Sequence, residues 1–140
     1  MKAVDCAKLL LSRDNFLILT HRNPDGDTLG SAGALCHALR RMGKTAWLFP
    51  NPDITDHFRP LVERYLAPGD FAGESTLAVD IAAETQFPKG FEGKVDLGID
   101  HHPSNSRYAS RLLLQEQRAS CGEIMLRVIK AMCGNVFKAE

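Results

Sequence analysis

Hydrophobic positions along the chain fall into two kinds of segment that alternate. Short apolar runs bounded by polar loops are typical of buried parallel strands. Longer stretches with an apolar residue at every third or fourth position predict amphipathic helices. The short runs predict strands at 16–20, 45–49, 76–79, 95–99 and 111–115. The longer stretches predict helices at 3–13, 28–42, 56–66 and 120–133. This alternation predicts an α/β fold: a three-layer sandwich with a mainly parallel central sheet and helices on both faces.

Two of the predicted helices carry clear end signals. Asp27 is expected to cap the N-terminus of the helix at 28–42, and Gly43 suits the left-handed position that follows its last turn. Ser120 and Glu123 form an S-x-x-E pattern, which predicts a capping box at the start of the last helix.

Composition narrows the classes of function. The 140 residues suffice for one domain with a substantial core. With 17 basic and 17 acidic residues, the chain lacks the excess positive charge that a long duplex nucleic acid would require, but a short anionic substrate held by metals fits. No apolar stretch reaches the length of a membrane span, and the N-terminus does not resemble a secretory signal. Four scattered cysteines without C-x-x-C spacing indicate a reducing compartment, so we expect a cytoplasmic protein.

Residues with metal-binding chemistry follow three of the predicted strands. They are His21, Asp25 and Asp27 after the first strand, Asp80 after the third, and Asp100, His101 and His102 after the fourth. Because the carboxyl ends of parallel strands meet at one edge of a sheet, residues about 80 positions apart are expected to share one cleft. Four carboxylates and three imidazoles would repel one another there without cations, so we predict two divalent metal ions. Mixed nitrogen and oxygen ligands favour Mn²⁺.

Each of the three motifs also has an ordinary structural explanation. Gly26 is expected to let the backbone turn sharply so that both neighbouring carboxylates point inward, but the same loop could be a simple turn with Asp27 as a helix cap. Asp80 could cap a turn, and the histidine pair could lie in an exposed turn. Gly30-Ser31-Ala32-Gly33 could bind an anion at a helix N-terminus or allow close helix–sheet packing.

Taken together, the order, spacing and strand context of these motifs resemble those of the DHH phosphoesterases. That family includes RecJ-type single-strand exonucleases, nanoRNase/3′-phosphoadenosine phosphatases, cyclic dinucleotide phosphodiesterases and family II inorganic pyrophosphatases. The segment at 21–31, His-Arg-Asn-Pro-Asp-Gly-Asp-Thr-Leu-Gly-Ser, and the Ser-Cys-Gly-Glu start of the last helix at 120–123 resemble the nanoRNase-like bacterial branch.

The resemblance implies a set of five metal ligands. One Mn²⁺ would be bound by His21 and Asp25, the other by Asp27 and His101, and Asp80 would bridge the two. Mg²⁺ is the alternative ion.

Two further catalytic residues are implied by the same resemblance. Asp100 would be a supporting carboxylate, and His102 would contact the scissile phosphate or its leaving group. The implied activity is hydrolysis of short oligonucleotides or 3′-phosphorylated nucleotides by a hydroxide held between two metal ions. The alternatives are an inorganic pyrophosphatase-like hydrolase and a metal- or nucleotide-binding module without turnover.

The resemblance also implies a domain organisation. Residues 1–140 would be the DHH catalytic domain, truncated before a fourth motif that supplies another Asp ligand, with the C-terminal DHHA1 domain absent. Val136 and Phe137 are expected to begin a further apolar element. A homodimer, or the missing C-terminal domain, would be the macromolecular partner.

Overall fold

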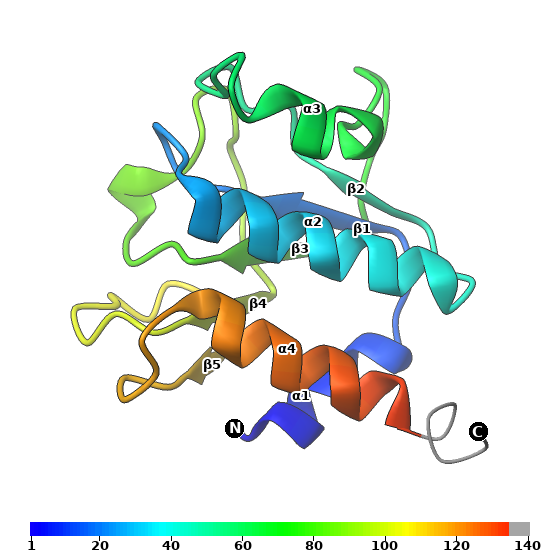
Figure 1. Ribbon diagram of the computed structural model, residues 1–140, viewed down its shortest axis with the longest axis vertical. Helices are drawn as coiled ribbons and strands as arrows, with labels where there is room; N and C mark the ends of the chain where they lie inside the picture. Colours follow the sequence, from blue (N-terminus) through cyan, green and yellow to red (C-terminus); the bar gives the residue numbers. More distant parts are fainter. Residues whose placement is uncertain (135–140) are drawn as a thin grey trace.

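Five parallel strands form the centre of the computed structural model, which describes residues 1–134 (Figure 1). In chain order they are β1 (Phe16–Leu19), β2 (Ala46–Leu48), β3 (Ser75–Val79), β4 (Leu97–Asp100) and β5 (Arg111–Leu114). Their order across the sheet is β2-β1-β3-β4-β5, so the three strands that precede the candidate motifs are neighbours at its centre. All five predicted strands are confirmed, each slightly shorter or shifted by a residue or two.

Three helices cover one face of the sheet: α1 (Ala3–Leu11), α2 (Gly26–Arg41) and α4 (Cys121–Met132). Figure 1 shows α2 and α4 side by side across that face, and α1 packs against α4. The helix predicted at 56–66 is wrong in its extent, because only α3 (Arg59–Val62) and the 3₁₀ turn η1 (Glu63–Tyr65) form there. Pro60 lies in the first turn of α3 and has no N–H to donate, so the helix cannot extend backwards from it.

The two faces of the sheet bury different cores. The helical face holds the larger core, built on strand residues such as Phe16, Ile18, Val79 and Ile99. On the opposite face, a smaller apolar cluster centres on Leu19, Ala78, Ile81 and Val95, with Phe49, Phe87, Phe91 and Tyr108 packed around it. The β3–β4 connection covers this face, and its only regular element is the 3₁₀ turn η2 (Glu84–Gln86). The α/β fold with a parallel central sheet is confirmed, and the layer on this second face is mostly irregular chain among the described residues.

The helix-end signals are largely confirmed. Gly43 has a φ of +83° after α2, and the Ser120 hydroxyl accepts a hydrogen bond from the Glu123 backbone N–H at the start of α4. No helix within residues 1–134 has the length and apolar character needed to cross a bilayer. The cysteines are free thiols, and three of the four are buried. Val136 and Phe137 lie outside the described residues.

Candidate metal centre

The ends of β1, β3 and β4 bring the three motifs together. Strand register pairs Leu19 with Ala78 and Val79 with Ile99, so the chain leaves all three strands at one edge of the sheet. Asp80 is the meeting point. Its Oδ2 lies 3.9 Å from Nε2 of His21, and its Oδ1 lies 3.3 Å from Nε2 of His101.

The start of α2 presents Asp25 and Asp27. Asp25, not Asp27, is the N-cap: its carboxylate accepts from the Thr28 backbone N–H at 3.0 Å. The sharp turn expected at Gly26 does not form, because Gly26 is the first helical residue of α2. Helix geometry itself therefore sets the directions of the two carboxylates. Asp25 Oδ1 lies 3.6 Å from Nε2 of His21.

Asp27 is held by a helix from the other end of the chain. Its Oδ2 accepts from the Cys121 backbone N–H and its Oδ1 from the Gly122 backbone N–H, both at 3.0 Å. These are unpaired N–H groups of the first turn of α4, where the helix dipole favours a negative charge. Asp27 Oδ2 lies 3.8 Å from Nε2 of His101, so this carboxylate faces the centre while α4 fixes it from behind.

Asp80 has a left-handed backbone conformation and a buried, incompletely hydrogen-bonded carboxylate. The residue has a φ of +65°, which is sparsely populated by residues with a Cβ. Its side chain is only 4% exposed, and Oδ1 has no hydrogen-bond partner among the described residues. Burial, and next the negative charge of Asp27, raise the pKa of Asp80 to about 6. A buried, unpaired carboxylate oxygen of this kind is a suitable ligand for a cation.

Hydrogen bonds orient two of the three imidazoles. Nδ1 of His21 donates to the Arg22 carbonyl at 2.7 Å, which leaves Nε2 facing the carboxylates. Nδ1 of His102 donates to Oδ1 of Asp100 at 2.6 Å, which leaves its Nε2 free. A partner on one ring nitrogen that fixes the tautomer is the usual arrangement around metal-bound or catalytic histidines.

Two sets of side chains have ligand atoms close enough to hold a cation. One is His21, Asp25 and Asp80, and the other is Asp80, Asp100, His101 and His102; within each set the ligand atoms lie within 4.8 Å of one another. Asp80 belongs to both sets, as a bridging ligand would. The second set contains Asp100 where the family resemblance implies Asp27. Asp100 is only 1% exposed and already accepts three hydrogen bonds, so it is better placed to support its neighbours than to bind a cation.

A comparison with known protein families shows to which family the chain belongs. Residues 15–139 match the model of the DHH family, N-terminal domain. The chain belongs to the DHH family.

Individual relatives agree with this assignment. The bifunctional oligoribonuclease and PAP phosphatase NrnA of Thermus thermophilus is 33% identical over 116 residues, which are 80% of this chain and 35% of NrnA. The chain therefore spans about a third of that relative's length. An exopolyphosphatase-related protein from Bacteroides fragilis superposes with a TM-score of 0.76 at 20% identity, over 93% of this chain and 43% of that one. At that identity the likeness shows the fold.

Two asparagines support the centre of this DHH domain in roles that the sequence did not predict. Asn51, 2% exposed, follows β2 and donates from Nδ2 to the carbonyl of His21 at 2.8 Å and to the Thr20 hydroxyl at 3.0 Å. Asn105 donates to Oδ2 of Asp100 at 2.8 Å. Both lie in Pro- or Ser-containing loops, where an Asn is so common that it carries no signal.

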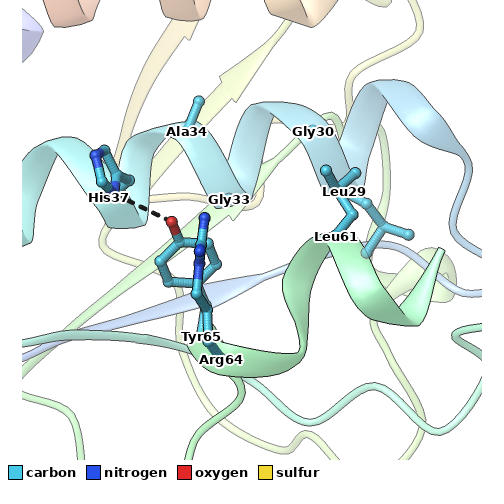
Figure 2. Close-up of a pocket in the computed structure, with 8 residues that line it drawn as sticks. All are labelled: Leu29, Gly30, Gly33, Ala34, His37, Leu61, Arg64 and Tyr65. Atoms are coloured by element: carbon cyan, nitrogen blue, oxygen red, sulfur yellow. Dashed lines mark hydrogen bonds between the residues drawn. The ribbon is translucent and has the colours of Figure 1, made fainter.

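A cavity of about 300 Å³ opens on the candidate metal centre and is lined by His21, Asp80, Ala82, Gln86 and His102. A second cavity of similar size lies between α2 and the α3–η1 segment (Figure 2). None of the described residues that line it carries a carboxylate. The Nδ1 atom of His37 forms a hydrogen bond with the Tyr65 hydroxyl at 3.1 Å. The glycine segment at 30–33 contributes to this second cavity, and Gly33 packs against Val62 and Tyr65. That contact favours close packing over an anion site, but the packing partner is the α3–η1 segment and not the sheet that was expected.

Proposed function

We propose that this chain is the metal-binding domain of a Mn²⁺-dependent phosphoesterase that hydrolyses short oligonucleotides or 3′-phosphorylated nucleotides. The observation that carries the proposal is the position of Asp80, whose two oxygens face different histidines and whose Oδ1 is buried without a partner. The printed activities of the relative NrnA support the choice of substrate. Because the chain spans a third of that relative, we further propose that a separate substrate-binding domain adds affinity for the substrate, while the residues of this chain carry out the hydrolysis.

The donor set fits two divalent cations. In the proposed assignment His21 and Asp25 hold one ion, Asp27 and His101 hold the other, and Asp80 is shared. Imidazole nitrogen combined with carboxylate oxygen suits Mn²⁺, with Mg²⁺ as the alternative. Bound cations supply a water molecule of lowered pKa and neutralise phosphoryl oxygens.

His102 is the proposed contact to the reacting phosphate. Its side chain is 40% exposed and lines the cavity, while its Nδ1 is held by the buried carboxylate of Asp100. In the imidazolium form, in which both ring nitrogens carry a proton, its Nε2 is therefore the atom that would donate to a phosphoryl oxygen or give its proton to the leaving oxygen. Asp100 acts as the positioning residue for this contact, and Asn105 holds Asp100 in turn.

The test uses the whole chain, stripped with a chelator and then supplied with Mn²⁺. Substrates are a 5′-phosphorylated dinucleotide, 3′-phosphoadenosine 5′-phosphate and pyrophosphate, and products are separated by anion-exchange chromatography. We expect hydrolysis of the first two substrates only with Mn²⁺. Because losing even an outer partner of a metal site typically reduces activity about 10–100-fold, Asp80→Asn should reduce the rate by roughly 100-fold or more. The matched control is Asp70→Asn, an exposed residue in the turn that precedes β3.

Three other outcomes would contradict the proposal. Phosphate release from pyrophosphate without cleavage of the dinucleotide would favour a pyrophosphatase-like enzyme. Binding of Mn²⁺ that depends on Asp80, without hydrolysis of any phosphoester, would favour a metal- or nucleotide-binding module. Equal rates for the wild type and Asp80→Asn would remove Asp80 from the chemistry.

A further inference from the structure

We propose that the hydroxyl of Thr28 is a positioning group that holds Asp80 in its left-handed conformation and thereby sets the affinity of the centre for divalent cations. The proposal rests on the metal centre of the proposed function, but not on the identity of the substrate. Thr28 is fully buried and is the third residue of α2. Its hydroxyl is hydrogen-bonded to the backbone of Val79 and not to any of the proposed ligand side chains.

Thr28 links two of the ligand-bearing segments. Its backbone N–H donates to Oδ1 of Asp25 at 3.0 Å, which fixes one proposed ligand directly. Its hydroxyl donates to the carbonyl oxygen of Val79 at 2.8 Å, and Val79 is the last residue of β3. The first turn of α2 is thus joined to the point at which the chain enters Asp80.

The peptide unit between Val79 and Asp80 is held at both of its polar atoms. On one side, the Val79 carbonyl accepts from the Thr28 hydroxyl. On the other side, the Asp80 backbone N–H donates to the Ile99 carbonyl of β4 at 2.9 Å. Rotation of this peptide would break both bonds, so together they stabilise the φ of +65° at Asp80.

That stabilisation is needed because other forces disfavour the observed conformation. The left-handed region is unfavourable for an L-residue, although somewhat less so for Asp. The charges of Asp27 and Asp100 also oppose a charged carboxylate at Asp80. Without the Thr28 bond, the Val79 carbonyl would be a buried acceptor lacking this partner, and cation binding would have to reorder the ligand.

The experiment compares Thr28→Val with Thr28→Ser. Val keeps the β-branched shape but lacks the hydroxyl, whereas Ser keeps the hydroxyl. Mn²⁺ is titrated calorimetrically into each chelator-stripped chain, and metal-free stability is measured separately by urea unfolding. We expect Thr28→Val to bind Mn²⁺ about 10–100-fold more weakly and Thr28→Ser to bind as the wild type does.

Controls separate positioning from general stability. Tyr65→Phe removes another buried hydroxyl that contacts α2, through His37, away from the metal centre. It should lower stability without changing Mn²⁺ affinity. If Thr28→Val fails to fold, Thr28→Ala provides a second chain without the hydroxyl and should show the same weakened binding.

Each outcome decides the proposal. Unchanged Mn²⁺ affinity in the folded hydroxyl-free variants, or a wild type that binds no Mn²⁺, would overturn it. A Thr28→Ser chain as weak as Thr28→Val would show that the side chain acts through packing. A wild type that binds Mn²⁺ but hydrolyses no phosphoester would refute the proposed function alone, because the affinities would still decide the role of Thr28.

Discussion

Replacing Asp80 with Asn is expected to stabilise the metal-free protein while destroying its metal site. The side chain is buried, and its carboxylate is close to Asp27 and Asp100, so charging it in the absence of a cation is unfavourable. Asn has nearly the same shape, carries no charge and tolerates a positive φ better than most residues. The substitution therefore removes the penalty and leaves the backbone conformation accessible.

The pKa of Asp80 gives the size of the stability gain expected for Asp80→Asn and the pH range in which it appears. Burial raises this pKa from an ordinary value of 3.8 to about 6, so the folded state binds the proton more tightly than the unfolded state. The free energy of unfolding contributed by Asp80 therefore decreases as the pH rises from about 4 to about 6 and stays low above that range. A pKa difference of roughly 2 corresponds to roughly 3 kcal/mol, which is the upper limit of the expected gain for Asp80→Asn at pH 7.5.

Urea unfolding in the presence of a chelator measures this gain. At pH 7.5 we expect Asp80→Asn to be about 1–3 kcal/mol more stable than the wild type. At pH 4 the difference should fall below about 1 kcal/mol, since Asp80 is then protonated in the folded state and close to half protonated in the unfolded state. Adding Mn²⁺ should stabilise the wild type and not the variant. Asp70→Asn serves as the exposed control. An equal gain at both pH values, or none at pH 7.5, would refute the reasoning.

Three further substitutions test two asparagines beside the centre and the packing at the opposite end of the sheet. Asn51→Leu should lower stability by about 1–3 kcal/mol in urea unfolding and weaken Mn²⁺ binding measured by calorimetry, because the buried amide holds the carbonyl of His21. Gly73→Ala should be destabilising by about 1–3 kcal/mol in the same unfolding assay, because a Cβ there would lie 2.8 Å from Cβ of Leu17; unchanged stability would contradict the packing at the start of β3. Asn105→Ala should reduce dinucleotide hydrolysis about 10-fold or more while leaving Mn²⁺ affinity nearly unchanged, because it releases the buried carboxylate that orients His102.

The convergence of the three motifs was predictable because it depends on a regular property of parallel sheets. Each motif follows an apolar run, and parallel strands place their carboxyl ends at one edge. His21 and His101 lie 3.9 Å and 3.3 Å from the carboxylate of Asp80 for that reason. The order of the strands was not predicted from the apolar pattern, which is the same for a central strand and for its neighbours.

Details that depend on contacts between distant segments were missed or wrongly assigned. Asp25 and Asp27 are equally good capping residues by composition, and only the observed start of α2 shows that Asp25 caps it. The S-x-x-E pattern located the start of α4 correctly, but no local pattern indicates that its first N–H groups face a carboxylate 94 positions earlier in the chain. Asn51 was missed because its partners lie in a different loop.

The attachment of Asp27 to the start of α4 has a consequence for the order in which the centre can be assembled. Ribosomal synthesis releases the histidines and aspartates of all three motifs before Cys121 and Gly122 emerge. Until those two amides are in place, the carboxylate of Asp27 lacks the hydrogen bonds that fix its orientation. The nascent chain would therefore bind cations less tightly than the folded domain. Binding of the proposed metal ions is therefore expected to follow the emergence of α4 from the ribosome.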